Sequence, residues 1–218
     1  MAKGESKGDS SLRKLPRWFY ARPAVALAPD LLGKLLVHQA PEGRTSGLIV
    51  EVEAYAGPAD RAAHSYGGRP TPRTRVMYGP PGRAYVFFVY GMHYCFNVVA
   101  GGEGEPEAVL VRAVEPVEGI ELMTRRRRRP VRTDADLVQL TNGPGKLAAA
   151  LGIDLNLYGE DLTGDRLFLA EGRPVGRQEI IASPRIGVEY AGEWADRLWR
   201  FSLAGNPYVS VPPPPHTH

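Results

Sequence analysis

The chain has one cysteine, few lysines and no long apolar run. A lone Cys95 excludes an internal disulfide framework, a four-cysteine zinc site and a cysteine-held iron–sulfur cluster within one chain. No stretch approaches the roughly 18 uncharged apolar residues of a membrane-spanning helix. Charges occupy residues 1–16, where a secretory signal would be apolar. These absences disfavour membrane insertion and secretion, and they predict a protein of the reducing cytoplasm.

Several common catalytic and nucleotide-binding motifs are also missing. Residues 140–147 are similar to a phosphate-binding loop, but Leu140 stands where the first glycine belongs and Leu147 replaces the magnesium-binding Ser or Thr. Glu107 breaks the dinucleotide fingerprint that Gly102 begins. The five histidines include no pair four residues apart, and no G-x-S-x-G elbow occurs. We therefore expect neither a metal nor a cofactor.

What the chain does contain is an ordinary globular composition with an unusual basic set. Its 218 residues, 43% hydrophobic and 23% charged, suit one soluble domain. Of the 27 basic residues, 22 are arginine. The planar guanidinium suits phosphate better than an ammonium does, which favours a nucleic-acid partner. A GC-rich coding sequence explains the same skew equally well, so charge alone decides nothing.

The composition divides the chain into three parts. Residues 1–14 are rich in Lys, Ser and Gly and hold too little apolar material to pack, which predicts a disordered basic arm. Residues 15–211 form the predicted domain, and residues 212–218 a proline-rich tail. We expect a monomer.

Strand patterns outnumber helix patterns and do not alternate with them, which predicts the α+β class with a largely antiparallel sheet. Alternation over residues 47–55 and a hairpin over 84–99 that turns near Gly91 are the clearest strand signals. The remaining expected elements are a helix passing into a strand over 24–37, a strand over 108–114, a helix that follows Pro116, with this proline at its first turn, and ends before Pro130, a helix over 144–151, and short strands over 166–169, 179–182 and 199–203.

The strand over residues 47–55 carries a candidate catalytic group. Glu51, Glu53 and Tyr55 fall on one face of it, and His64 follows nine residues after Tyr55. A carboxylate beside aromatic and imidazole rings suits a flat, stacked ligand, with Glu53 as a general base or as a partner for a developing cation. The alternative is that both glutamates lie on a solvated face.

The hairpin tip, Tyr90-Gly91-Met92-His93, places bulky groups where turns usually carry polar ones. An exposed apolar tip needs a reason, and in a nucleic-acid protein it could be a wedge that enters between bases. The alternative is that the tip folds back into the core.

The chain resembles the alkyladenine (3-methyladenine, methylpurine) DNA glycosylase family over most of residues 20–211. The resemblance rests on the run of residues 50–58 and on Ala62-Ala63-His64-Ser65, Gly67-Gly68-Arg69, Thr71-Pro72-Arg73, Met77, Tyr90-Gly91-Met92, Asn142-Gly143-Pro144, Lys146-Leu147, Arg185-Ile186-Gly187-Val188 and Ala191-Gly192-Glu193-Trp194. It implies a single compact domain around a curved, mostly antiparallel sheet, with peripheral helices and a hairpin that protrudes into the minor groove. It also implies double-stranded DNA containing damaged purines as the partner.

The resemblance also implies roles for single residues. Glu53 would activate the attacking water, and Arg112 would hold Glu53 and that water, although a structural ion pair explains Arg112 as well. The base pocket would be lined by Tyr55, His64, Phe87 and Asn97. The intercalating tip would be Tyr90 with Met92 and His93. Two positions depart from the family pattern, since Phe87 replaces a tyrosine and His93 replaces an aromatic residue.

The arginine run of residues 125–129 has two interpretations, phosphate contact or a solvated helix end. The predicted phosphate contacts are Arg69, Arg73, Lys146, Arg125 and Arg126. No lysine lies near Glu53 in the sequence, which predicts a monofunctional enzyme that hydrolyses with water and leaves an abasic site. Two other functions stay open: a catalytically silent binder of damaged nucleic acid, and a hydrolase that acts on RNA or nucleosides.

Overall fold

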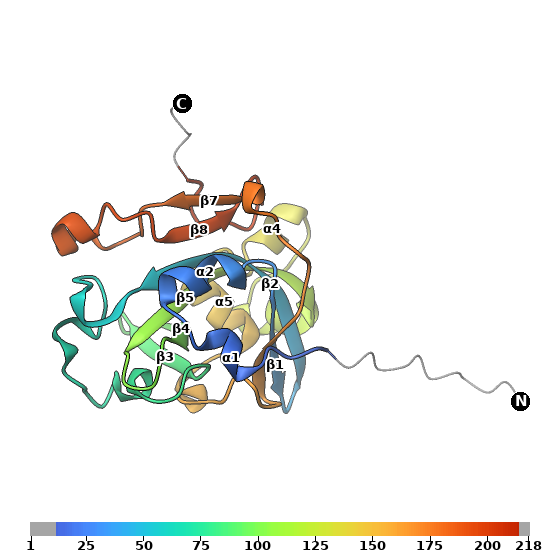
Figure 1. The fold of residues 1–218 in the computed structure, drawn as a ribbon. Helices are drawn as coiled ribbons and strands as arrows, with labels where there is room; N and C mark the ends of the chain where they lie inside the picture. Colours follow the sequence, from blue (N-terminus) through green and yellow to red (C-terminus); the bar gives the residue numbers. More distant parts are fainter. Residues whose placement is uncertain (1–11, 214–218) are drawn as a thin grey trace, which may run out of the picture.

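An eight-stranded antiparallel sheet forms the frame of the molecule in the computed structural model, which describes residues 12–213 (Figure 1). Six strands follow the order β3-β4-β5-β2-β1-β6, and β8 pairs with β2 and β7. The strands are β1 (Leu35–Ala40), β2 (Gly43–Tyr55), β3 (Ala84–Val89), β4 (His93–Ala100), β5 (Glu107–Glu118), β6 (Leu167–Ala170), β7 (Ile180–Ser183) and β8 (Arg200–Leu203). The α+β prediction is confirmed.

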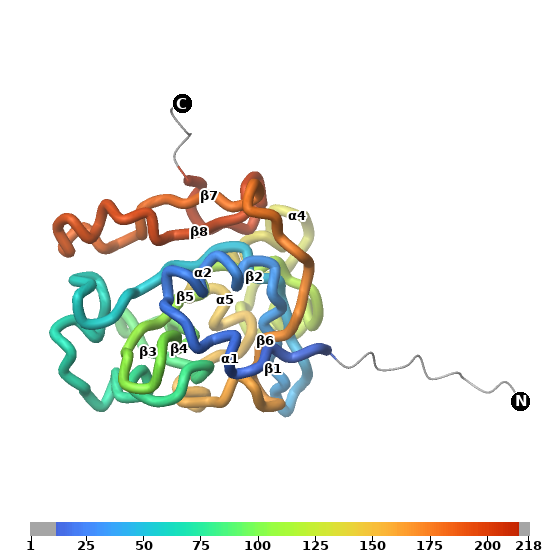
Figure 2. The backbone as a smooth tube through the Cα atoms, in the orientation of Figure 1, coloured from blue at the N-terminus to red at the C-terminus, as the bar shows by residue number. Residues whose placement is uncertain are grey.

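The helices are short and peripheral. They are α1 (Arg17–Tyr20), α2 (Ala24–Leu31), α3 (Ile120–Arg127), α4 (Asp134–Val138) and α5 (Pro144–Leu151). Among the described residues there are also six 3-10 turns: η1 (Gly57–Ala59), η2 (Tyr66–Gly68), η3 (Arg75–Tyr78), η4 (Leu155–Leu157), η5 (Arg177–Glu179) and η6 (Glu189–Trp194). In Figure 2 the path can be followed from β1 and β2 through the long 56–83 connection to β3. No helix within the described part of the chain is long and apolar enough to cross a membrane.

Strand β2 curves because its pairing with β5 is irregular. The register shifts at Ser46/Gly47, at Ile49/Glu51 and at Glu51/Val52, and an extra residue in one strand bends it and increases its twist. On its other edge, β2 pairs with β1 over residues 43–48 and with β8 over residues 51–53. The bend therefore allows β8, with β7 beside it, to join the sheet at β2, and the two strands lie at the top of the view in Figure 1.

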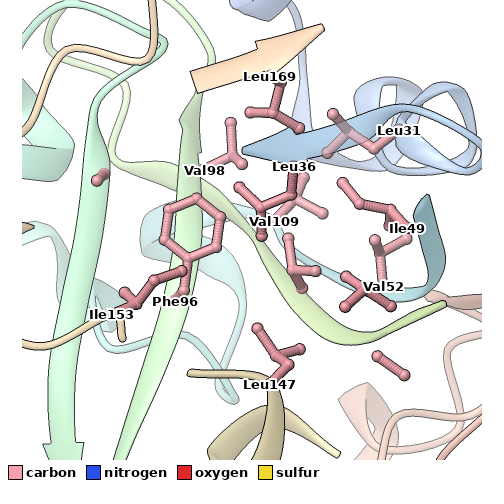
Figure 3. Close-up of a cluster of buried hydrophobic side chains, with 14 of the residues drawn as sticks. Leu31, Leu36, Ile49, Val52, Phe96, Val98, Val109, Leu147, Ile153 and Leu169 are labelled. Carbon is pink, nitrogen blue, oxygen red and sulfur yellow. The ribbon is translucent and has the colours of Figure 1, made fainter. Parts of the chain in front are cut away.

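One face of each central strand builds the core. Val52 of β2, Val109 of β5 and the even-numbered residues Phe96 and Val98 of β4 are fully buried together with Leu147 of α5 (Figure 3). Burying one such side chain stabilises the fold by about 1.5–3 kcal/mol. Successive side chains of a strand point to opposite faces, so the other residues of these strands face away from the core. They are available to line a cavity on the opposite face of the sheet.

The structure corrects one expected helix boundary and excludes one of the alternatives left open by the sequence. The helix expected after Pro116 begins only at Ile120, because β5 continues through Pro116 to Glu118. Gly119 makes the change of direction with φ +78°, and a Cβ there would lie 2.3 Å from the Arg44 carbonyl oxygen. The solvated-face interpretation of Glu51 and Glu53 also fails, since both residues are fully buried.

The predicted arm and tail fall mostly outside the described residues. Within them, Lys14 forms an isolated antiparallel bridge with Ala170, and Leu12 packs against the cluster around Val37 and Phe168. Residues 12–14 are thus joined to β6 and β1. The predicted tail of residues 212–218 is described only at 212 and 213.

Candidate active site

A cavity of about 380 Å³ opens on the face of the sheet opposite the core. Its floor consists of alternate residues of four strands, and its rim consists of the hairpin, the start of α5 and the segment before η6. The lining side chains are Glu53, Tyr55, Ala62, His64, Met77, Tyr85, Phe87, Val89, Tyr90, His93, Cys95, Asn97, Ala108, Leu110, Arg112, Pro144, Ile186, Val188 and Tyr190. The volume is in the range of small-molecule sites, about 300–1,000 Å³.

Strand register places the floor residues in one row. Tyr85 pairs with Asn97, Asn97 pairs with Leu110, and Leu110 pairs with Glu53. The row crosses β3, β4, β5 and β2, so residues far apart in the chain point into one cavity.

Burial raises the pKa of Cys95, in the neighbouring row, to about 11, which keeps it a neutral thiol.

Glu53 is the buried carboxylate of the cavity, and it is held by three donors. The Ile186 amide donates to Oε1 at 2.8 Å, the Arg112 guanidinium lies 3.2 Å from Oε1, and the Tyr55 hydroxyl donates to Oε2 at 2.9 Å. Burial, followed by the nearby Glu53 charge, raises the pKa of Tyr55 well above its ordinary value, so the phenol keeps its proton. Oε1 has two partners and Oε2 one, which leaves Oε2 an accepting position for a water.

Arg112 joins Glu53 to a second buried carboxylate. Its Nε donates to Glu51 Oε1 at 3.0 Å, and Arg200 Nη1 donates to the same oxygen at 3.1 Å. The Ser210 amide donates to Glu51 Oε2 at 2.6 Å. Two carboxylates and two guanidinium groups therefore balance their charges beneath the cavity. Arg112 forms buried ion pairs with Glu51 and Glu53 and also lines the cavity, which leaves both roles considered from the sequence open to it.

The aromatic wall is formed by His64, Tyr85 and Phe87. The rings of His64 and Phe87 are 4.6 Å apart between centres and nearly perpendicular. His64 Nδ1 lies 2.8 Å from the Tyr85 hydroxyl. Burial of its inner side and the nearby Arg73 guanidinium lower the pKa of His64 to about 4. At neutral pH this wall is uncharged.

Asn97 and Tyr55 complete the predicted pocket set. Asn97 is buried on β4, where its Nδ2 donates to the Tyr85 carbonyl oxygen at 3.0 Å. Tyr55 has the Arg185 guanidinium 4.9 Å from its ring centre, and Arg185 forms a fully buried ion pair with Asp60. All six residues predicted for the catalytic and base-pocket roles line one cavity.

The hairpin tip projects into solvent, so the folded-back alternative is wrong. Tyr90 is 86% exposed and Met92 71% exposed. Tyr90 and Gly91 both have positive φ, 53° and 66°, and the Met92 amide donates to the Val89 carbonyl oxygen. This geometry is a two-residue hairpin turn that matches the twist of its strands. Tyr90 and His93 line the cavity mouth, whereas Met92 lies outside the lining set.

The predicted phosphate contacts are scattered, and none of them lines the cavity. Arg69 and Arg125 are exposed. Lys146 donates to Gln139 and Asn142, and Arg73 contacts His64. Arg126 donates to Glu42 and to the Ala150 carbonyl oxygen, so its guanidinium already serves the fold.

Sequence reasoning gave no role to the segment that covers the site. Ile186 supplies the amide donor to Glu53, and Tyr190 stands 72% exposed at the cavity rim. Both follow Arg185, whose ion pair with Asp60 spans 125 positions of the chain. No local pattern signals a contact of that range. Only the resemblance at residues 185–188 drew attention to this segment.

Comparison with known proteins agrees with this geometry. Residues 18–207 match the model of the family described as methylpurine-DNA glycosylase (MPG). A protein of Clostridium acetobutylicum is 52% identical over 91% of this chain and 98% of its own length, and one of Desulfitobacterium hafniense is 51% identical over 92% and 100%. Both are named "Putative 3-methyladenine DNA glycosylase". The chain thus belongs to the methylpurine-DNA glycosylase family, and the enzyme is a DNA glycosylase of this class.

Proposed function

We propose that the protein flips alkylated purines of the 3-methyladenine type out of duplex DNA and hydrolyses their N-glycosidic bond with a water activated by Glu53. The observation that carries this proposal is a fully buried carboxylate at the end of a cavity with aromatic walls. The names of the two relatives support the choice of substrate.

Base flipping is supported by the exposed hairpin beside the cavity. Extruding a base costs a few kcal/mol, and less at a damaged pair. Tyr90 would enter the stack from the minor groove and fill the space the base leaves. Stacking of the base on Tyr55 and Phe87 would return about 1–3 kcal/mol for each ring. The balance favours the damaged base over a normally paired one.

The chemistry follows from the position of Glu53. As the bond between the sugar carbon and the purine nitrogen breaks, the electron pair leaves with the base and the sugar gains oxocarbenium character. A carboxylate at about 4 Å from this charge is worth about 4 kcal/mol at an effective dielectric constant near 20. The water oxygen then bonds to the sugar carbon, its proton passes to Glu53, and general-base action contributes about 10²–10⁴-fold.

The properties of the leaving group suit this site. A purine alkylated at a ring nitrogen is cationic and leaves as a neutral base, so it needs little acid assistance. No lysine of the described chain lines the cavity, which supports hydrolysis by water with an abasic product and no Schiff base. Hypoxanthine and ethenoadenine are neutral and leave less readily, so the rate at which the enzyme releases them measures the breadth of its substrate range.

The test is to incubate the protein with methylated duplex DNA and to measure the free modified purines and the abasic sites. Release of 3-methyladenine without strand cleavage is the expected result. Binding without release would identify a silent binder of damaged DNA instead. Faster release from a methylated nucleoside or from RNA than from the duplex would identify the other rival. A borohydride-trapped enzyme–DNA adduct would contradict the monofunctional mechanism.

A further inference from the structure

Arg73, in the connection between β2 and β3, contacts two rings of the aromatic wall from outside the cavity. Its Nη2 lies 2.9 Å from His64 Nε2, and its guanidinium carbon lies 4.8 Å from the centre of the Phe87 ring. Guanidinium is flat and weakly hydrated, so one side chain can stack on a ring and donate to a neighbouring group at the same time. Arg73 is therefore attached to the base pocket itself.

The contacts of His64 with Arg73 and Tyr85 favour one position for the proton of its ring. A guanidinium has only N–H donors, so the ring nitrogen that receives it has to be an acceptor. Arg73 Nη2 is closer to Nε2, at 2.9 Å, than to Nδ1, at 3.2 Å. His64 Nδ1 in turn lies 2.8 Å from the Tyr85 hydroxyl. Both contacts are satisfied when Nε2 accepts from Arg73 and Nδ1–H donates to Tyr85.

Building on the proposed function, we propose that Arg73 is a positioning residue that holds His64 neutral, with its proton on Nδ1, in a pocket that receives a cationic base. A second proton, added on Nε2, would break the hydrogen bond from Arg73. It would also make the ring an imidazolium and place a positive charge on the wall that the base contacts. Arg73 itself is exposed and lies outside the cavity lining, so its charge is farther from the base than a charge on the His64 ring would be. The arrangement therefore keeps repulsion away from the base.

The other groups that face His64 carry no charge near neutral pH. Tyr85 of β3 is the titratable neighbour, and burial raises its pKa to about 12. Phe87 of the same strand does not titrate. Arg73 is thus the charged group in contact with the ring, and together with burial it lowers the pKa of His64 to about 4. A phosphate contact alone would give no reason for the guanidinium to be fixed on these rings.

The first test needs no DNA. The His64 imidazole is titrated by NMR in the wild type and in Arg73→Met, with assignment by the loss of its signal in His64→Asn. Its pKa is expected to rise from about 4 toward the ordinary 6.5 in Arg73→Met. Arg75→Met is the matched control, because Arg75 is an exposed cation of the same connection and makes no hydrogen bond to His64. An unchanged pKa in Arg73→Met would overturn the proposal.

The second test is the pH profile of single-turnover release of 3-methyladenine from duplex DNA. In Arg73→Met, release should fall about tenfold for each pH unit below the new His64 pKa, whereas Arg75→Met should keep the wild-type profile. Arg73→Lys retains a cationic donor and should restore most of the wild-type profile. A loss that is equal at every pH and accompanied by a flatter salt dependence would instead make Arg73 a phosphate contact. If the wild type releases no base, the proposed function fails while the NMR result still stands.

Discussion

At Glu53, one side chain combines complete burial with an accepting position left open on Oε2. Glu53→Gln keeps the shape of the side chain and removes both the negative charge and the proton-accepting oxygen. We expect single-turnover base release to fall at least about 10²-fold, because general-base catalysis contributes about 10²–10⁴-fold. Affinity for damaged duplex, measured by fluorescence anisotropy, should stay within a few fold of the wild type.

The matched control is Glu118→Gln, which removes an exposed carboxylate at the end of β5. It should release base at the wild-type rate. If Glu53→Gln also turned over at that rate, Glu53 would have no part in the chemistry.

The sequence showed which side chains share one face of this strand, but it did not show whether that face is buried. Alternation in residues 47–55 correctly placed Glu51, Glu53 and Tyr55 on one face. Whether that face meets water depends on residues 186–211, which supply the Ile186 and Ser210 amides more than 130 positions later. A solvated strand face and a buried one have the same local pattern, and only long-range contacts separate them.

Among the elements, the β3–β4 hairpin holds Tyr90 in a left-handed backbone conformation that costs a non-glycine residue free energy. Tyr90→Ala removes the ring and leaves the cavity floor unchanged. We expect weaker flipping, observed as a smaller rise in 2-aminopurine fluorescence beside the lesion and about a tenfold slower release. Tyr90→Trp retains a wedge and should recover activity. Full activity in Tyr90→Ala would show that the tip is dispensable.

The arginine run divides between the fold and solvent. Arg126 donates to Glu42, and Arg129 lies 3.5 Å from Asp136, whereas Arg125 is exposed. Arg125→Ala should lower the slope of log affinity against log salt by about 0.9 if it neutralises one phosphate. Arg44→Ala, at the start of β2, serves as a control of equal charge. An unchanged slope in Arg125→Ala would assign that arginine to the solvated end of α3.

Element boundaries were predictable where the signal is local. Pro144 at the first turn and Gly152 beyond the last turn mark α5, and the structure has Pro144–Leu151 with Gly152 at φ +71°. Pro116 was mispredicted as a helix start because proline also occurs in strands at irregular points of the hydrogen-bond ladder. Its partner Gly47 lies at the register shift between Ser46 and Gly47. The curvature of the sheet was available only through the family resemblance, because bulges arise from pairing between distant strands.

At the scale of the whole molecule, a buried histidine, His38, makes the free energy of unfolding depend on pH. His38 is buried in β1 with Nδ1–H donated to the Leu151 carbonyl oxygen, and burial lowers its pKa below the ordinary 6.5. As pH falls, His38 takes up a proton in the unfolded protein before it does so in the folded protein. The stability that neutral His38 contributes is therefore fully present above about pH 6.5 and is lost as the pH falls below that value. The expected slope is at most about 1.4 kcal/mol per pH unit for one such group.

Urea unfolding at a series of pH values measures this dependence. His38→Asn can still donate to Leu151 and should remove the His38 share of the slope between pH 6.5 and the lower pKa. A slope identical to that of the wild type would show that another group is responsible. His64→Asn, measured beside it, reports the share of the second histidine whose pKa burial lowers.

The closure of the Glu51 network by Ser210 also sets the order in which the site can be completed during synthesis. Glu51 and Glu53 leave the ribosome about 150 residues before Arg200 and Ser210, which supply a guanidinium and an amide donor to Glu51. Until those residues emerge, Glu51 lacks two of its three partners, and contacts between residues so far apart in the chain form slowly. The candidate site is therefore among the last parts of the protein to mature, so a nascent chain carries the sequence of the site well before it has the site itself.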